Sequence, residues 1–168
     1  MPLSMYQASV PVFQRQLGVL SQLLHKGLAH VQAQGADPAT LVQARLAPDM
    51  FTLAGQVQSA SDAAKFGAAR LAGVAPPRFE DNEATFEELQ ARIARTLEFL
   101  AAVQPAQIDG SEGKSIVLKV GGREMPFEGQ PYLLGFVLPN FFFHVTTAYA
   151  ILRHQGVAIG KRDFLGQV

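Results

Sequence analysis

Apolar residues recur every three or four positions along most of this chain, which is the spacing of one buried face on a helix. Four segments show the pattern at a length that predicts long helices, namely 3–34, 48–72, 80–104 and 130–154. In the first segment, Pro11 either sits in the first turn of a later-starting helix or kinks a longer one. Gly35 supplies the stop signal at the end of that segment.

The segment 132–152 is the most apolar part of the chain and has no acidic or basic side chain apart from His144. It is long enough to cross a bilayer, but Pro139, Asn140 and His144 interrupt its middle. A helix that is apolar nearly all round is also typical of an element surrounded by other elements. We therefore expect the central helix of a packed core, with a bend or break before Pro139.

Shorter elements connect the four helices. Asp37 followed by Pro38 predicts a brief helix over 38–44, because aspartate caps a helix and proline suits its first turn. Two glycines at 121–122 separate two short β-like runs, which predicts a hairpin of Ser115–Val120 with 123–127. Such a hairpin must pack against the helices or against a second subunit to be stable. The fold class is all-α, a single four-helix up-down bundle over residues 1–168 with a small β-hairpin between helices 3 and 4.

Composition narrows the functional classes. The chain has 14 basic and 14 acidic residues and no block of like charge, so neither nucleic acid nor an anionic membrane is an expected partner. It has no cysteine, which excludes disulfides, thiolate catalysis and cysteine-ligated metals. The first residues lack the pattern of a signal peptide, and we expect a cytoplasmic protein.

Polar groups on the apolar helix are the first candidates for chemistry. At 100° per residue, His144 falls roughly 80° from the centre of the inner face, where it looks into the bundle or along a groove. An imidazole there can bind a metal, act as an acid or base, or simply be a hydrogen-bonded core residue. Asn140 and Tyr149 are the other polar groups expected near a ligand groove on this helix.

Asp49 and Gln56 are seven residues apart and share one side of the expected second helix. Both would face His144 if the second and fourth helices are neighbours. Alternatively, Asp49 is a first-turn carboxylate on the helix dipole and Gln56 a boundary residue. Asp62 falls on the outer side of the same helix, where we expect it in solvent, as we do the imidazoles of His25 and His30 on the first helix.

The third helix carries capping signals at its start. Glu80 to Glu83 place negative charge where the helix dipole favours it, and Thr85 with Glu88 has the spacing of a capping box. Glu88 and Arg92, four residues apart, are expected to pair across one turn.

Several runs of residues resemble one bacterial family, the domain of unknown function nineteen ninety-three, across nearly the whole chain. These runs are LAPDMF at 46–51 with QVQ at 56–58, FEDNE at 79–83, KVGG at 119–122 and PNFFFHVTTAYAILR at 139–153. The family is allied to the DinB/YfiT-like bundles, which are described as metalloenzymes. The resemblance implies a four-helix bundle, often a homodimer.

The metal site of DinB-like proteins typically uses one histidine from helix two and a His-x-x-x-His pair on the last helix. His144 matches one member of that pair, but Ala148 stands four residues later and helix two has no histidine. A divalent metal at His144 would therefore need oxygen ligands such as Asp49 or Gln56. We expect a small-ligand-binding or interaction module without a three-histidine site. The alternatives are a divergent metal-dependent transferase or hydrolase and a purely structural protein.

Overall fold

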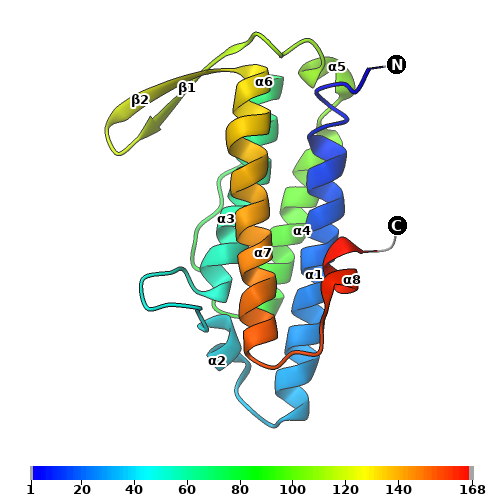
Figure 1. The fold of residues 1–168 in the computed structure, drawn as a ribbon, viewed down its shortest axis with the longest axis vertical. Coiled ribbons are helices and arrows are strands. Elements are labelled where there is room, and N and C mark those ends of the chain that lie inside the picture. Colours follow the sequence, from blue (N-terminus) through cyan, green and yellow to red (C-terminus); the bar gives the residue numbers. More distant parts are fainter. Residues whose placement is uncertain (1, 167–168) are drawn as a thin grey trace.

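The computed structural model describes residues 2–166 and is mostly helical. Its long helices are α1 (Val10–Ala33), α3 (Leu53–Ala72), α4 (Phe86–Ala102) and α7 (Leu138–His154), which lie side by side (Figure 1). The shorter elements are α2 (Pro38–Val42), α5 (Pro105–Ile108), β1 (Ser115–Val120), β2 (Arg123–Glu128), α6 (Gly129–Tyr132), the π-helical η1 (Leu133–Val137) and α8 (Lys161–Leu165). This order confirms the helices and the small hairpin expected from the sequence.

Three long helices begin later than the predicted segments, and α1 and α3 show two reasons for a late start. α1 starts at Val10 with Pro11 in its first turn, which is where the missing N–H of proline costs nothing. α3 starts at Leu53 because the Thr52 hydroxyl accepts a hydrogen bond from the Gly55 N–H at 3.2 Å and so caps the helix. The predicted start at residue 48 was wrong, and residues 43–52 form a loop beside α3 instead.

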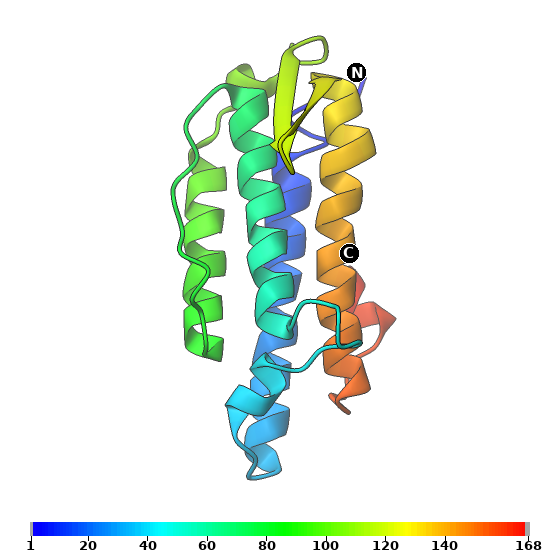
Figure 2. The same cartoon turned by 90° about the vertical axis from the view of Figure 1, so that its left-hand side faces the viewer.

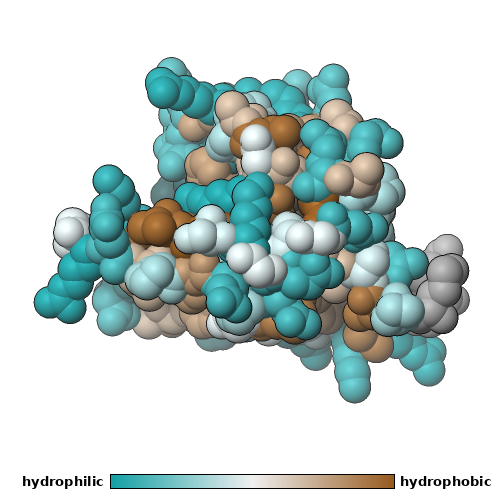
Figure 3. All heavy atoms as spheres, turned by 90° about the horizontal axis from the view of Figure 1, so that it is seen from above, coloured by the Kyte–Doolittle hydropathy of each residue, from teal (hydrophilic) through white to brown (hydrophobic). Residues whose placement is uncertain are grey.

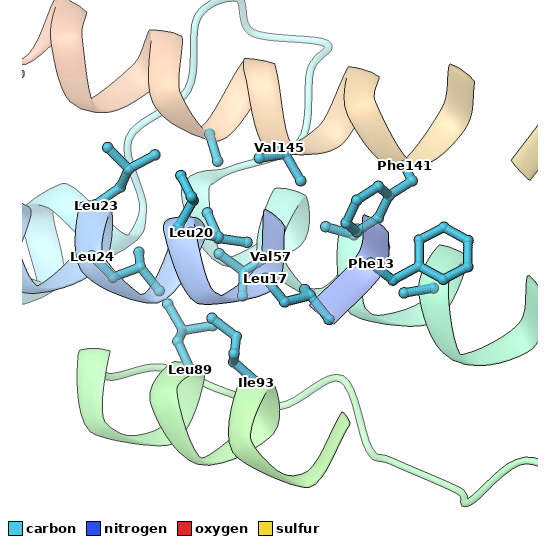
Figure 4. Close-up of a cluster of buried hydrophobic side chains, with 14 of the residues drawn as sticks. Phe13, Leu17, Leu20, Leu23, Leu24, Val57, Leu89, Ile93, Phe141 and Val145 are labelled. Carbon is cyan, nitrogen blue, oxygen red and sulfur yellow. The ribbon is translucent and has the colours of Figure 1, made fainter. Parts of the chain in front are cut away.

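The core lies where the apolar stripes of the four long helices meet (Figure 4). Burying one large apolar side chain contributes roughly 1.5–3 kcal/mol, so this set supplies the main stabilising term. The labelled members are Phe13, Leu17, Leu20, Leu23 and Leu24 from α1, Val57 from α3, Leu89 and Ile93 from α4, and Phe141 and Val145 from α7.

The predicted up-down order of the bundle is wrong at one connection, because α3 and α4 run parallel (Figures 1 and 2). Residues 74–85 run back along the length of the bundle between them, and α4 begins at Phe86, not near residue 80. Fully extended, these residues can span about 40 Å. At 1.5 Å per residue, the 17 residues of α4 need only about 26 Å. A connection of this length permits parallel neighbours, whereas short loops force antiparallel ones.

The β-hairpin projects from the α6 end of the bundle (Figure 1). Strand β1 pairs antiparallel with β2, with Val120 opposite Arg123 across the two-glycine turn. The helix α6 packs against both strands, and the Phe127 ring of β2 contacts the rings of Tyr132 and Phe136. Viewed from this end, hydrophobic residues reach the surface as small patches among hydrophilic ones (Figure 3).

The helix from Gly129 to His154 is long and apolar enough to cross a membrane by length and composition. It packs most extensively against α3 and also against α1, and 39% of its most apolar window is buried. A core helix of a soluble protein passes the same test, so one such helix is weak support for a membrane span.

Candidate functional site

A groove with a volume of about 310 Å³ runs between α3 and the α6–η1–α7 helix. Its lining combines aromatic rings with several hydrogen-bonding side chains, as small-molecule sites do. The lining residues are Ser59, Asp62, Ala63, Phe66 and Arg70 on α3, and Tyr132, Phe136, Val137, Asn140 and His144 on the opposite helix.

The π-helical turn η1 decides which side chains of the second wall face the groove. In an uninterrupted α-helix, Tyr132 and His144 would point about 120° apart, because each residue turns the chain by 100°. A π-helical turn accommodates one extra residue and so removes roughly 100° from this angle. Tyr132, Asn140 and His144 therefore share one stripe along the groove. The helix is not broken before Pro139 but continues from Gly129 to His154, with this π-helical turn as its irregularity.

His144 on α7 and Gln56 on α3 contact each other beside the groove. The His144 Nδ1 lies 2.7 Å from the Gln56 Oε1. The Gln56 Nε2 donates a long hydrogen bond of 3.4 Å to the carbonyl oxygen of Phe51, which fixes the orientation of the amide. The Gln56 oxygen therefore accepts the Nδ1–H proton, and His144 keeps an unprotonated Nε2.

The environment of His144 favours its neutral form, because burial lowers the pKa of the imidazole below its usual value. The Nε2 atom makes no hydrogen bond to any of residues 2–166. It is therefore available to accept a hydrogen bond or a proton from a ligand in the groove.

Two aromatic rings flank the His144 imidazole. The Phe51 ring stacks on it with a centroid distance of 6.4 Å, and the Phe143 ring meets it edge-on at 5.3 Å. Both phenylalanines are more than half exposed. Two exposed rings thus flank the histidine, while Ser59 and Asn140 line the groove near it.

Arg70 and Tyr132 line the other end of the groove. The Arg70 guanidinium donates a hydrogen bond of 2.9 Å to the Tyr132 hydroxyl and lies over the Phe66 ring. Tyr132 is almost completely buried, and burial raises the pKa of its hydroxyl, so the hydroxyl keeps its proton. Sequence patterns did not single out either residue, since Tyr132 opens the apolar segment 132–152 and Arg70 is a single charge near the end of a helix.

Asp62, expected in solvent, instead joins a buried ionic cluster at the edge of the groove. Its Oδ1 pairs with the Lys65 ammonium at 2.8 Å and with the Arg92 guanidinium at 2.9 Å. Arg92 also binds Glu83 at 3.0 Å and Asp81 at 2.9 Å. Burial alone would raise the pKa of Glu83, but hydrogen bonds from Arg92 and Gln58 outweigh it and lower that pKa.

The predicted pairing of Glu88 with Arg92 is wrong, because the two side chains have different partners. The Glu88 carboxylate accepts hydrogen bonds from the backbone N–H groups of Ala84 and Thr85 and completes the predicted capping box. Arg92 points inward and ties the 74–85 connection to α3 and α4. One signal was present in the sequence, since Arg92 is one residue from the buried Ile93 stripe.

The structure separates the predicted site residues into two groups. His144, Asn140 and Gln56 come together at the groove, although Gln56 lies behind His144 and not on the lining itself. Asp49 is exposed in the loop before α3 and does not share a helix face with Gln56. Tyr149 lies about 140° around α7 from His144 and packs against Phe164 instead.

The remaining histidines lie away from the groove. His25 is exposed, as expected. His30 is half-buried, and its Nε2 is shielded from solvent without a hydrogen-bond partner among residues 2–166, so the expected solvation is wrong.

The residues at the groove do not form a complete metal-ligand set. Within residues 2–166, no three histidine, cysteine, aspartate or glutamate side chains lie close enough to hold one ion together. His144 and Asp62 are the two such residues on the groove lining, and Asp62 is committed to two buried cations. The three-histidine arrangement of DinB-like metal sites does not fit this groove.

The fold and the groove between two long helices define a helical bundle of the DinB type. A crystal structure of a DinB family member protein from Shewanella denitrificans is similar, with a TM-score of 0.88 and 36% sequence identity. The match covers 97% of this chain and 92% of the other. The family model described as Domain of unknown function (DUF1993) matches residues 5–165, and the chain belongs to this family. No match was found among functionally curated proteins.

Proposed function

We propose that this protein binds a small organic molecule in the groove between α3 and α7, with His144 as the group that recognises or deprotonates it. The observation that carries the proposal is the 2.7 Å contact between the His144 Nδ1 and the Gln56 Oε1. This contact sets the tautomer, so that the unprotonated Nε2 is the free nitrogen. A core histidine would also be satisfied by this bond, but here the second ring nitrogen makes no hydrogen bond within residues 2–166 and stays free for a ligand, as an acid–base or binding histidine requires.

The groove suits a molecule with an aromatic or apolar body. Phe66 and Phe136 contribute rings to its walls, and Phe51 and Phe143 stand at the His144 end. A hydroxyl, amide or ammonium group of the ligand would donate to the His144 Nε2, since that atom is an acceptor in the neutral ring.

The test is ligand binding to wild-type protein and to a double variant, His144→Phe with Gln56→Met. Replacing both partners leaves no buried amide oxygen without a donor, so the fold is expected to survive. We expect fragments that shift groove resonances of the wild-type protein in heteronuclear NMR to bind the double variant at least tenfold more weakly. This is a loss of about 1.4 kcal/mol in binding free energy. His154→Phe is the matched control, because His154 is exposed on the same helix outside the groove. Equal binding by both variants contradicts the proposal.

The second candidate function is a divergent metal-dependent transferase or hydrolase that uses His144 with oxygen ligands. An oriented imidazole with a free Nε2 is also the usual state of a metal-binding histidine. The incomplete ligand set argues against it, and we derive no metal-dependent step. Elemental analysis of purified protein beside His144→Ala separates the two functions, since stoichiometric metal lost in the variant would favour the enzyme.

We further propose that the protein is a cytoplasmic homodimer whose hairpin lies in the subunit interface. Val117, Val120 and Met125 are exposed on the hairpin, although Ile116 and Leu118 of β1 are buried. Two strands alone are marginally stable, so a partner surface would stabilise them. Val117→Glu is expected to shift the protein from dimer to monomer in analytical ultracentrifugation, while Lys119→Glu, also exposed on β1, leaves the dimer intact. A dimer that persists in Val117→Glu would contradict a hairpin interface.

A further inference from the structure

The end of the groove opposite His144 collects hydrogen-bond donors that have no acceptor. Arg70 forms no ion pair among residues 2–166, and the one side-chain hydrogen bond of its guanidinium goes to Tyr132. A guanidinium has five N–H donors, and since Arg70 is exposed, most of them face solvent and are available to a ligand. Stacking over Phe66 holds the Arg70 fork in place beside the groove.

The buried Tyr132 hydroxyl adds a second free donor at the same place. Its oxygen accepts the Arg70 hydrogen bond, so its own proton must point elsewhere. No acceptor for that proton is present among the described residues, although Tyr132 is only 1% exposed and lines the groove. Because Tyr132 lines the groove, this proton is available to an acceptor that enters the groove.

Asn140 extends this set of donors toward His144. Its side chain lines the groove and makes no hydrogen bond within residues 2–166. Because the π-helical turn lies between Tyr132 and Asn140, the two side chains share one stripe of the helix. The arrangement therefore runs from a cationic end at Arg70, through an amide, to an acceptor at His144.

The negative charge on the groove wall is already compensated. Asp62 is the acidic residue on the lining, and its Oδ1 pairs with both Lys65 and Arg92. These two cations are buried and cannot move away to solvent. Arg70, in contrast, carries a positive charge with no protein counter-ion, and a ligand that brings an anion meets no unpaired carboxylate.

We infer that the ligand of this groove is an organic anion with a carboxylate or phosphate group bound by Arg70 and Tyr132. Both anions accept the paired hydrogen bonds that a guanidinium fork offers. The body of the ligand lies between Phe66 and Phe136 and places a hydrogen-bond donor at the His144 Nε2. This inference rests on the proposed ligand-binding function and adds the chemical class of the ligand.

NMR titrations of the full chain measure its affinity for four probes that share a phenyl ring. Phenylacetate and phenyl phosphate carry the two anions, phenylacetamide is neutral and phenethylamine is cationic. We expect either anionic probe to bind at least tenfold more tightly than the neutral one, with shifts at Arg70 and Tyr132. The tighter of the two anions then identifies the carboxylate or the phosphate as the preferred group.

Variants locate the anion within the groove. Arg70→Gln is expected to weaken the better anionic probe by tenfold or more, and Tyr132→Phe by several-fold, because each removes a donor to a charged group. Arg153→Gln is the control, since it removes one exposed positive charge from α7 outside the groove. Thermal unfolding of each variant checks that the bundle is intact.

The outcomes separate this inference from the proposed function. Binding of the anionic probes that is equal to phenylacetamide, or unaffected by Arg70→Gln, overturns the organic anion. If binding of the neutral or cationic probe still depends on His144 and Gln56, the proposed ligand-binding function stands and only the anionic ligand class is wrong. If no probe of any charge shifts the groove resonances, both fail.

Discussion

His144 owes its chemistry to neighbours that lie far from it along the chain. Its partner Gln56 is 88 residues away, and Phe51, whose carbonyl orients Gln56, belongs to the loop before α3. The sequence indicated that His144 borders a groove, because helical spacing alone decides which face it occupies. The tautomer and the lowered pKa depend on packing and could not be predicted from that spacing.

The lowered pKa of His144 predicts how stability changes with pH. The unfolded chain binds this proton more readily than the folded protein does. The contribution of His144 to the free energy of unfolding is therefore fully present above about pH 6.5 and is lost as the pH falls through the folded pKa. The slope from one group cannot exceed about 1.4 kcal/mol per pH unit. Asp62 and Arg70 are the charged groups that share the groove with it, and their charges are opposite.

Urea unfolding at pH 7.5 and 5.5 measures this effect. Wild-type protein is expected to lose more stability between the two pH values than the His144→Phe, Gln56→Met double variant, whose groove has no imidazole. An NMR titration that places the His144 pKa at or above 6.5 would contradict the prediction.

At the scale of elements, the π-helical turn η1 and α3 approach each other at a glycine. A Cβ added to Gly67 would lie 2.5 Å from the Val137 Cγ1, which is well inside van der Waals contact. At this glycine, the close neighbour of α3 is Val137 of η1. The sequence predicted an irregularity before Pro139 but not its π-helical form.

Gly67→Ala is expected to destabilise the protein by about 1–3 kcal/mol, since it overpacks this contact. Gly18→Ala is the matched control, because the added Cβ on α1 meets no atom within 4 Å. That change is expected to stabilise α1 by roughly 0.5–1 kcal/mol through helix propensity. Urea denaturation measures both free energies of unfolding. Partial rescue of Gly67→Ala by Val137→Ala would locate the effect at this contact, and a neutral Gly67→Ala would disprove it.

At the scale of the whole molecule, the parallel arrangement of α3 and α4 depends on the connection over residues 74–85. Arg92 is fully buried and binds carboxylates of two different segments, Asp62 on α3 and Glu83 in the connection. Phe79, within the connection, covers the Lys65 ammonium at 4.2 Å. Ion pairs and one aromatic ring thus hold a long extended segment against the helices.

Arg92→Met is expected to cost about 3–5 kcal/mol, because it leaves buried carboxylates without their cation. The free energy of unfolding from urea titration measures this loss. Arg95→Met serves as the control, since Arg95 is half exposed and lies 4.0 Å from Glu83. Limited proteolysis should then cut the 74–85 connection faster in Arg92→Met than in the control. Equal stability of the two variants would show that the cluster does not secure the connection.

Local patterns in the sequence determined the number of long helices, the hairpin, the capping of α4 and the groove-facing position of His144. These features follow from spacing and from hydrogen bonds within a few residues. The tertiary structure decided the parallel α3–α4 pair, the burial of Arg92 and the meeting of Arg70 with Tyr132. Each of these joins residues far apart in the chain, where the relative phase and direction of helices decide the contacts and no local spacing encodes them.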